Sequence, residues 1–426
     1  MPDVYILTLG CPKNTVGSRR LEKALTLLDV RVIDNPDAAA AIIVNTCGFI
    51  DAAKEESIDY LLELDNRRPK QSGQKIIAIG CLAERYGMEL AKAMPEVDSF
   101  LSFDELRTLP GILQVKGELN LDFQAHTGGA TAYLEISDGC NNRCSFCAIP
   151  VIRGPYRSRP EGHIVAEAVE LAEKGCRELV LVGQDTGAYG YDVAPKTDLS
   201  GLLGRLVEVK GIDWIRIMYL QPQYLTAELI SVLAAEAKIC SYLDIPFQHA
   251  DAKIIKAMNR WGDEGSYLKL IEGIKEKIPD IAIRTSVIVG FPGETETQLA
   301  RLARFLRRAE LDYVGVFEFS AEEGTAAAYL PRQLGARTKR TRSEQIRALA
   351  DEISARRHRR FIDRTLDVLV ESVSADGFVG RSSYQAPEID GEVVVGGGGH
   401  FSPGEMVRVA IERSDDYDLM GRSDDG

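Results

Sequence analysis

The first hundred residues alternate between short apolar runs and longer stretches with helical spacing. The runs at residues 4–9, 41–44 and 76–79 are apolar, rich in β-branched side chains and free of alternating polar positions. Strands that are buried on both faces of a parallel sheet have this pattern. Between the runs, leucines such as Leu21 and Leu25 recur at helical intervals. The segment is therefore predicted to form an open parallel α/β sheet of βαβ units.

Two further patterns follow along the chain. Six more strand-like runs, separated by helical patterns, predict six βα units, at residues 132–137, 179–182, 214–218, 242–245, 281–289 and 313–317. Short alternating stretches with Gly- and Pro-rich turns then predict a small antiparallel barrel, with strands at residues 366–370, 391–395 and 406–411. We therefore expect three domains, at residues 1–125, 126–360 and 361–426.

The composition is that of a folded protein with a sizeable core. Of the 426 residues, 45% are hydrophobic and 27% are charged, which excludes a disordered chain, a collagen-like chain and a small disulfide scaffold. No apolar run approaches the ~20 residues that a membrane span needs. Residue 4 opens a strand-like pattern without a preceding basic region and apolar signal core. We therefore expect a cytoplasmic protein without a membrane partner.

The chain carries a net charge of −13. Proteins that bind nucleic acid usually carry more basic than acidic residues, so the negative net charge argues against a protein of this class. Local basic patches can coexist with a negative net charge. The same sequence contains eight cysteines. In a long cytosolic chain, cysteines are better explained as metal or redox ligands than as disulfides.

Each of the first three predicted strands ends at a cysteine: Cys11, Cys47 and Cys81. They are 36 and 34 residues apart, which matches one βαβ unit. Because the carboxyl ends of parallel strands open on one edge of the sheet, the three thiols should converge there. The alternative is that they are small buried hydrophobic residues. Three thiolates without a histidine in this segment favour an iron–sulfur cluster over zinc, which normally takes four protein ligands.

A second set of cysteines follows the strand at residues 132–137. Cys140, Cys144 and Cys147 are closely spaced and have no fourth protein ligand nearby. A 4Fe-4S cluster held by three cysteines has one iron open to a substrate. A zinc site is the alternative, but the nearest histidine, His163, lies outside ordinary finger spacing. The spacing and its position after a strand resemble the radical S-adenosylmethionine (SAM) superfamily.

The six βα units accordingly resemble the open (β/α)6 barrel of that superfamily, whose chemistry lies at the carboxyl ends of the strands. Polar residues or glycines follow three of these strands: Gln184 and Asp185, Gln248 and His249, and the turn at residues 290–294. In this turn, Gly290 and Gly293 suit a close approach to the adenosyl part of SAM, although a tight βα turn explains them equally well. His249 and Asp244 are either structural residues or contacts of substrate or cofactor.

The two cysteine sets, in this order, resemble the radical SAM methylthiotransferases over the whole chain. One branch of that family acts on adenosine in transfer RNA, and the other, the RimO branch, on an aspartate of ribosomal protein S-twelve. The chain resembles the RimO branch at residues 10–14, 137–140, 184–186, 322–325, 380–382 and 386–391. Gly17 and Arg19 depart from the usual Asp and Glu, and Ala321 from a usual Pro. These departures concern local loop contacts rather than cluster ligands.

The resemblance implies two 4Fe-4S clusters. Cys140, Cys144 and Cys147 would hold the one that binds and cleaves SAM, and the resulting radical would take hydrogen from the aspartate β-carbon. The other cluster, where a sulfur is methylated by a second SAM and then transferred, would be held by Cys11, Cys47 and Cys81. No catalytic side chain is assigned, since the chemistry lies at the clusters. The implied partners are ribosomal protein S-twelve, free or in the ribosomal subunit, a reductant such as flavodoxin or ferredoxin, and a sulfur donor.

Two alternatives remain. One is the RNA-directed branch of the family. The other is a non-catalytic iron–sulfur electron carrier, which would normally use four cysteines per cluster.

The C-terminal segment differs from the rest in charge. Residues 336–360 form a basic helical pattern, for which a solvated helix face is the simpler explanation. Residues 361–426 resemble a TRAM domain and carry 14 acidic and 5 basic residues. Such a surface repels a polyanion and attracts a basic protein, so no direct nucleic-acid substrate is expected. Glu388, Asp390 and Glu392 are expected on this surface, and Cys176 and Cys240 are expected to be structural.

Overall fold

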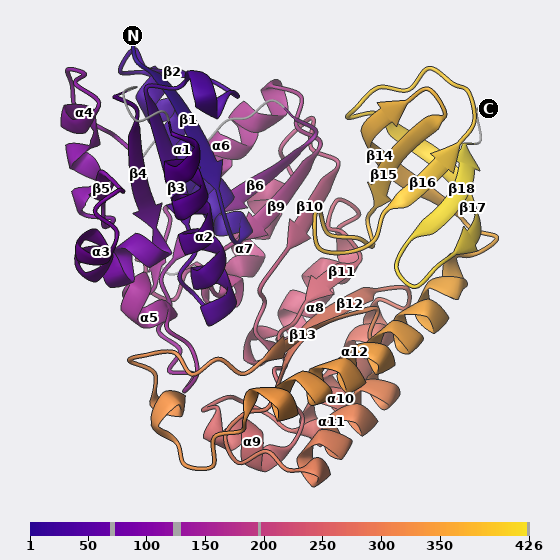
Figure 1. Cartoon of the computed structure of the whole chain (residues 1–426). Coiled ribbons are helices and arrows are strands. Elements are labelled where there is room, and N and C mark those ends of the chain that lie inside the picture. Colours follow the sequence, from indigo (N-terminus) through magenta and orange to yellow (C-terminus); the bar gives the residue numbers. More distant parts are fainter. Residues whose placement is uncertain (69–72, 122–128, 195–196, 424–426) are drawn as a thin grey trace.

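The computed structural model describes residues 1–68, 73–121, 129–194 and 197–423. Its strands fall into three groups (Figure 1): an N-terminal domain, a partial barrel in the middle and a closed C-terminal barrel. The predicted limits of the three domains stay predictions, and the first boundary, at residues 125 and 126, lies outside the described residues. No helix in the described part of the chain is both long and apolar enough to cross a membrane.

The N-terminal domain is built on a five-stranded sheet in the order β2-β1-β3-β4-β5, in which all the strands are parallel. Its strands are β1 (Asp3–Thr8), β2 (Arg31–Val32), β3 (Ala41–Thr46), β4 (Lys75–Gly80) and β5 (Ser99–Phe100). Its main helices are α1 (Pro12–Thr26), α2 (Asp51–Arg67) and α3 (Cys81–Ala93), with the short α4 (Leu109–Ile112) near its end.

Neighbouring residues of β3 pack on opposite sides of the sheet: Ile43 belongs to one buried cluster and Ile42 and Val44 to another. This two-sided burial explains why the run lacks polar positions, and it confirms the predicted parallel sheet.

The middle of the chain forms six parallel strands in two adjoining three-stranded sheets, ordered β6-β9-β10 and β11-β12-β13. A parallel bridge between Ile215 and Ile239 joins the two sheets. Within the described residues no pairing closes β6 onto β13, so the barrel is partial, as predicted. The strands are β6 (Thr131–Glu135), β9 (Glu178–Val182), β10 (Trp214–Ile217), β11 (Tyr242–Asp244), β12 (Ala282–Val289) and β13 (Tyr313–Glu318).

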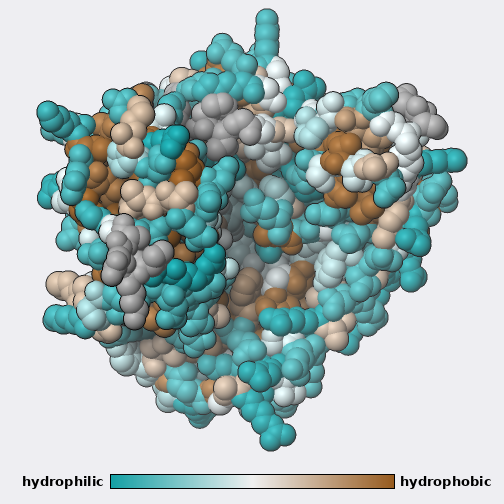
Figure 2. All heavy atoms as spheres, turned by 45° about the horizontal axis from the view of Figure 1, so that its top comes forward, coloured by the Kyte–Doolittle hydropathy of each residue, from teal (hydrophilic) through white to brown (hydrophobic). Residues whose placement is uncertain are grey.

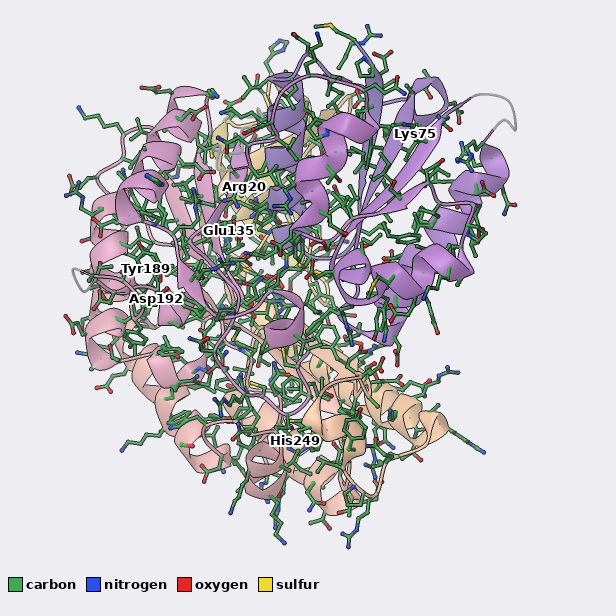
Figure 3. All side chains as sticks on the ribbon, turned by 90° about the vertical axis from the view of Figure 1, so that its left-hand side faces the viewer. Arg20, Lys75, Glu135, Tyr189, Asp192 and His249 are labelled. Carbon is green, nitrogen blue, oxygen red and sulfur yellow. The ribbon has the colours of Figure 1, made fainter. Side chains whose placement is uncertain are left out.

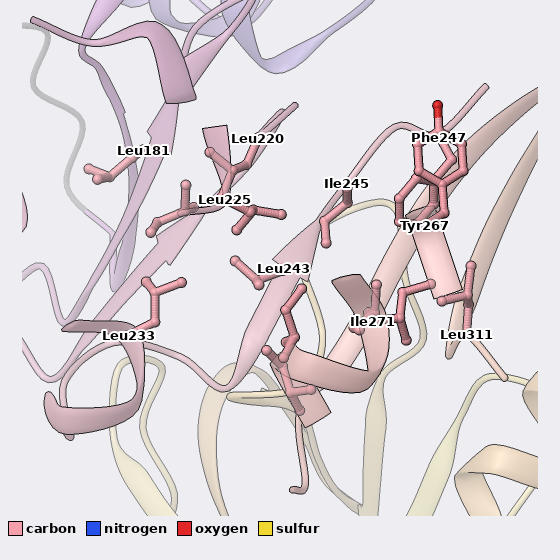
Figure 4. Packing of buried hydrophobic residues seen from close by; sticks show 14 of the residues in the cluster. Leu181, Leu220, Leu225, Leu233, Leu243, Ile245, Phe247, Tyr267, Ile271 and Leu311 are labelled. Atoms are coloured by element: carbon pink, nitrogen blue, oxygen red, sulfur yellow. The ribbon is translucent and has the colours of Figure 1, made fainter. Parts of the chain in front are cut away.

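An outer layer of helices covers the partial barrel (Figure 1). These helices are α6 (Glu161–Glu173), α7 (Leu199–Leu206), α8 (Ala227–Ala235), α10 (Glu264–Lys277) and α11 (Glu296–Ala309). Figure 4 shows the apolar layer between strands and helices, with Leu243, Ile245 and Ile271 in it. Phe247 and Tyr267 belong to the same layer, and their rings are tilted against each other with centroids 4.6 Å apart. Smaller elements lie at the strand ends: β7 (Ser137–Asp138), α5 (Ile149–Ile152), β8 (Arg157–Ser158) and α9 (Ala252–Ala257).

The long helix α12 (Ala336–His358) leads to the C-terminal barrel, which closes in the order β14-β15-β16-β18-β17. Its strands are β14 (Thr365–Ser374), β15 (Gly377–Ser382), β16 (Val393–Gly396), β17 (Met406–Ser414) and β18 (Leu419–Ser423). The small barrel is confirmed, although β16 and β18 pair in parallel and the sequence pattern missed β15 and β18. Both of these strands are interrupted by Gly and Arg, which hide the alternation of apolar positions.

A loop of the C-terminal barrel, residues 382–390, packs against the inner face of the partial barrel near the amino ends of its strands. Glu178, at the start of β9, is fully buried between two arginines. Arg216 of β10 lies 2.7 Å from one carboxylate oxygen and Arg381 of β15 lies 2.6 Å from the other. Arg216 also donates a hydrogen bond to the carbonyl of Ser383. One buried carboxylate therefore joins the two barrels.

Asp390 is not part of the acidic surface, contrary to the expectation from sequence. Its side chain is fully buried, accepts a hydrogen bond of 2.7 Å from the Tyr242 hydroxyl and lies 3.4 Å from Arg284. Burial raises the pKa of this carboxyl. The residue is drawn inward because the loop that carries it enters the inner face of the partial barrel. Glu388 and Glu392 are exposed, as expected.

We expect Glu178→Gln to destabilise the protein by about 3–5 kcal/mol, because it leaves Arg216 and Arg381 buried without their counter-charge. Burial alone would raise the pKa of Glu178, but Arg381 and Arg216 outweigh it and lower the pKa to about 2. The stabilisation by the carboxylate is therefore complete above its ordinary pKa of 4.5 and is lost as the pH falls toward 2. Denaturant unfolding across this pH range measures both effects.

The matched control is Glu412→Gln on the same barrel, since the side chains of Glu412 and Arg422 form an exposed ion pair. Such pairs contribute at most about 1 kcal/mol. Equal unfolding free energies for the two variants would contradict the role given to Glu178.

Candidate functional site

The cysteines of the N-terminal domain meet at the carboxyl edge of its sheet. Cys11 precedes α1, Cys47 follows β3, and Cys81 begins α3 directly after β4. The turn before Cys11 lies against Cys47, because a Cβ added to Gly10, whose φ is +89°, would lie 2.6 Å from the Cys47 Cβ. The Cys81 sulfur lies 4.0 Å from Oδ1 of Asn14 in the first turn of α1. The structure thus brings the three residues to one place, as the sequence predicts.

Two of these thiols are buried and one is exposed. Burial raises the pKa of Cys47 to about 12 and also raises that of Cys81, whereas Cys11 is open to solvent. One guanidinium group counteracts the effect at Cys81: Arg153 has Nη2 3.6 Å from the sulfur and 3.2 Å from Oδ1 of Asn14. A positive charge beside a thiol favours its thiolate form, which is the form that binds metal.

The second set lies in the loop between β7 and α5. Asn142 donates a hydrogen bond of 3.4 Å to the Cys140 sulfur, and Arg260 lies with Nη1 3.7 Å from the Cys144 sulfur. Burial, together with the neighbouring Cys144 and Cys140, raises the pKa of Cys147 to about 12. Donors therefore face two of the three sulfurs of this set.

In the part of the chain that the structure describes, no three Cys, His, Asp or Glu side chains lie close enough to bind one metal ion. That the six cysteines act as ligands stays a prediction. Cys176 and Cys240 are both buried and belong to different apolar clusters away from these sets, in agreement with a structural role.

The glycine turn after β12 is fixed by a buried carboxylate. Glu294 accepts hydrogen bonds of 3.1 Å from the backbone N–H of Gly290 and of 2.7 Å from Arg342. A Cβ on Gly290 would lie 2.6 Å from the Lys339 side chain, whereas nothing lies within 4 Å of the position of a Gly293 Cβ. Gly290 is therefore needed for packing, and Gly293 leaves open space into which a ligand could fit.

The geometry at His249 and Asp244 favours structural roles. The fully buried His249 accepts hydrogen bonds at Nδ1 from two backbone N–H groups, so its Nε2 carries the hydrogen and faces Glu294 at 3.5 Å. Figure 3 places this histidine deep in the lower half of the molecule. Asp244 accepts a hydrogen bond from the backbone N–H of Tyr219 and lies 3.2 Å from Arg284. Both residues therefore hold the framework around the strand ends.

Asp185 has the geometry of a ligand-binding residue. It is fully buried, and burial raises its pKa to about 7, although Asn142 donates a hydrogen bond of 2.6 Å to it and acts in the opposite direction. The side-chain oxygen of the adjacent Gln184 is buried without a hydrogen-bond partner among the described residues. Buried polar atoms normally find a partner, so this edge of the site has capacity for a polar ligand group.

Sequence reasoning missed the contacts that join the N-terminal domain to the partial barrel. Glu135, at the end of β6, forms buried ion pairs with Lys13 and Arg20 of α1. Figure 3 shows Arg20 and Glu135 side by side. Lys13 also lies 3.0 Å from Asp138. Since Lys13 is two residues after Cys11 and Asp138 two residues before Cys140, this contact fixes the two cysteine sets relative to each other. The sequence feature that could have indicated this contact is Glu135 itself, a lone carboxylate inside an apolar strand.

A second buried carboxylate acts at the opposite edge of the partial barrel. Glu322 follows β13 and lies 2.9 Å from Lys54 of α2 and 2.8 Å from Arg85 of α3. The N-terminal domain is thus bound both to the first strand of the partial barrel and to the loop after its last strand. Figure 2 shows a hollow in the surface between the N-terminal domain and the C-terminal barrel, with apolar side chains inside it.

Comparison with protein families agrees with this architecture. The model of the radical SAM superfamily matches residues 134–306, that of the uncharacterized protein family UPF0004 residues 3–102, and that of the TRAM domain residues 362–423. Fold and site together define a radical SAM protein with an additional α/β domain in front of the barrel and a small β-barrel behind it.

Curated relatives named ribosomal protein uS12 methylthiotransferase RimO match nearly the whole chain. The protein from Clostridium acetobutylicum is 38% identical over 98% of this chain and 97% of its own length. Those from Anaeromyxobacter sp. and Syntrophus aciditrophicus are each 42% identical over 98% of this chain and over 92% and 97% of their own lengths. The chain therefore belongs to the RimO family of ribosomal protein uS12 methylthiotransferases.

Solved structures share the fold at low sequence identity. The radical SAM methyltransferase TsrM from Kitasatospora setae has a TM-score of 0.54 and 12% identity, covering 74% of this chain and 75% of that one. The cobalamin-dependent radical SAM enzyme OxsB has a TM-score of 0.52 and 11% identity, covering 83% of this chain and 56% of that one.

We expect Glu135→Gln to loosen the N-terminal domain, because Lys13 and Arg20 lose a buried counter-charge. A loss of about 3 kcal/mol corresponds to an increase on the order of 100-fold in local opening. Hydrogen exchange of the α1 amides measures it. The control is Glu170→Gln, which removes a half-exposed ion pair of 3.3 Å to Lys23 of the same helix. If α1 exchanges equally in both variants, Glu135 does not hold the domain.

Proposed function

We propose that Cys11, Cys47 and Cys81 hold one 4Fe-4S cluster, that Cys140, Cys144 and Cys147 hold another, and that the chain methylthiolates the β-carbon of an aspartate of uS12 (ribosomal protein S-twelve). One observation supports this proposal. Each set of three cysteines lies at strand ends, and the two sets lie on opposite sides of the contact between the N-terminal domain and the partial barrel. Each set has fewer thiols than the four ligands of an ordinary electron-transfer cluster. Each therefore leaves a coordination position for a substrate group.

The cluster held by Cys140, Cys144 and Cys147 would supply the electron for the cleavage of SAM, and the cluster held by Cys11, Cys47 and Cys81 would supply the sulfur for transfer. The protein supplies position and environment. Asn142 and Arg260 donate toward the sulfurs of the second set, and charge-assisted contacts of this kind stabilise thiolates. Arg153 does the same at Cys81.

For the amino group of SAM we propose Asp185 as the acceptor, since it is buried beside Asn142 and the unpaired oxygen of Gln184. The adenosyl part would lie against the open space at Gly293, and Gly290 would hold that turn in place. The aspartate of the substrate would enter through the hollow between the N-terminal domain and the C-terminal barrel.

The acidic C-terminal barrel supports a protein substrate rather than transfer RNA. Residues 361–426 contain 14 acidic and 5 basic residues, and the exposed acids among them, such as Glu388 and Glu392, would repel a polyanion. The remaining partners in this proposal are a cytoplasmic one-electron reductant, such as flavodoxin or ferredoxin, and a sulfur donor.

The two sets should be separable by mutation. Cys144→Ala should abolish formation of 5′-deoxyadenosine while leaving roughly half of the iron, since the other set lies in another domain. Cys47→Ala should keep SAM cleavage and lose methylthio transfer to uS12. Iron content and 5′-deoxyadenosine are measured on reconstituted protein with dithionite and SAM. Loss of both clusters in Cys47→Ala would refute two independent sites, and no 5′-deoxyadenosine from the intact protein would refute the enzyme.

Reversing exposed acids of the C-terminal barrel should weaken the capture of uS12. Glu388, Glu392 and Asp416 are exposed, and their change to Lys should raise the Kd at low salt by 10-fold or more while leaving SAM cleavage without substrate unchanged. The difference should shrink at high salt, since exposed charges are screened over about 3 Å at 1 M. Binding measured at two salt concentrations checks this, and equal affinity of wild type and variant at low salt would refute recruitment by charge.

A further inference from the structure

The basic residues of this acidic chain are concentrated on one part of its surface. Residues 141–158, 252–262 and 324–343 together carry eleven Lys and Arg and no Asp or Glu, although the whole chain has a net charge of −13. The first of these segments contains Cys144 and Cys147, the second contains α9, and the third leads into α12.

The three segments meet at the cysteine loop. Ser145, between Cys144 and Cys147, donates through its backbone N–H to the Met258 carbonyl at 2.9 Å and through its hydroxyl to the Ala257 carbonyl at 2.8 Å. Its own carbonyl accepts a hydrogen bond of 2.7 Å from the backbone N–H of Ala327. In Figure 1, the loop before α12 runs below α5 and beside α9.

Seven cations of these segments are exposed and form no ion pair with any residue in the described part of the chain; together they are called the basic face here. They are Arg143, Arg157, Lys253, Lys256, Arg332, Arg337 and Arg340. The other cations serve the interior, as Arg153, Arg260 and Arg342 do. Among the flanking acids, Asp263 caps α10 and Glu264 pairs with Arg304, whereas Glu323 and Glu344 are exposed.

Each segment also exposes one large apolar side chain. Val151 is 63% exposed, Trp261 46% and Tyr329 76%. Protein–protein interfaces are enriched in aromatic and Arg anchors surrounded by a polar rim. The combination of exposed aromatic side chains and unpaired cations is that of a binding surface, and Trp261 stays 46% exposed although its ring lies 5.9 Å from that of Tyr267, centroid to centroid.

We propose that the basic face docks a small acidic protein that carries single electrons, of the flavin or iron–sulfur class, and that it delivers its electron to the site of Cys140, Cys144 and Cys147. This inference rests on the proposed function. The carrier is oxidised by one electron and that site is reduced by one, so no further reactant is needed. The face surrounds the loop that carries these cysteines, and an acidic partner is repelled by the rest of the chain and steered to this surface.

The test uses a double variant and a matched control in the reconstituted full-length protein. Lys253→Glu with Lys256→Glu reverses two charges of the basic face. Lys210→Glu with Lys277→Glu makes the same change in charge at two exposed lysines that precede β10 and β12, at the opposite ends of the strands. Reduced flavodoxin is the probe, with formation of 5′-deoxyadenosine and binding of labelled flavodoxin as the two measurements.

We expect the KM and Kd for flavodoxin to rise at least 10-fold in the Lys253/Lys256 variant and less than 2-fold in the control. The rate with dithionite, a small reductant, should be unchanged in both. The difference should fade between 0.1 and 1 M salt, where the screening length shortens from about 10 to about 3 Å.

Equal KM and Kd values in the two variants would overturn the proposal while leaving the dithionite reaction, and with it the proposed function, intact. If the Lys253/Lys256 variant binds flavodoxin as well as the wild type does but loses binding to a ribosomal RNA fragment, the basic face is a nucleic-acid-binding surface and the proposal is overturned. If the wild type makes no 5′-deoxyadenosine with dithionite, the proposed function fails, and labelled flavodoxin binding still decides the docking site.

Discussion

The buried contact of Glu135 with Lys13 and Arg20 determines how the two halves of the site face each other. A buried carboxylate or ammonium group costs several kcal/mol unless it is paired, so the α1 helix has one favourable position on β6. Lys13 adjoins the first cysteine set, and its second partner, Asp138, adjoins the other. At the opposite edge of the partial barrel, Glu322 forms a second buried contact of this kind with Lys54 and Arg85. Between these contacts the N-terminal domain spans the open side of the partial barrel.

The residues that stabilise the fold and the residues of the proposed site lie at opposite ends of the same strands. At the amino ends, Glu178 joins Arg216 and Arg381 across the contact between the two barrels, and Asp390 is buried against Tyr242 and Arg284. At the carboxyl ends lie the cysteine loop and the turn after β12. In barrels of parallel strands the carboxyl face carries the catalytic residues and the amino face contributes to stability. The C-terminal barrel can therefore be attached firmly without blocking the site.

The sequence predicted the features that depend on local pattern. Apolar, β-branched runs identified β3, β4 and the strands of the partial barrel, and the cysteines at strand ends came together because parallel strands end on one edge. The two-residue strands β2 and β5 are too short to produce a pattern. Asp390 was misplaced because periodicity cannot show that its loop enters another domain. Glu135 is a lone charge in an apolar strand, but this signal was not used in the prediction, and its partner Lys13 lies 122 residues away along the chain.

Although the chain has a net charge of −13, it carries two surfaces of opposite sign, the acidic C-terminal barrel and the basic face. Their separation affects the order of events in the proposed reaction. The proposed substrate is a basic protein and the proposed electron carrier an acidic one, so each is attracted to one surface and repelled by the other. The acidic barrel lies beyond α12, whereas the basic face surrounds the cysteine loop near the start of that helix (Figure 1). Because neither partner needs the other's surface, an electron can enter while the substrate remains bound. A single surface serving both partners would require the substrate to leave before each reduction.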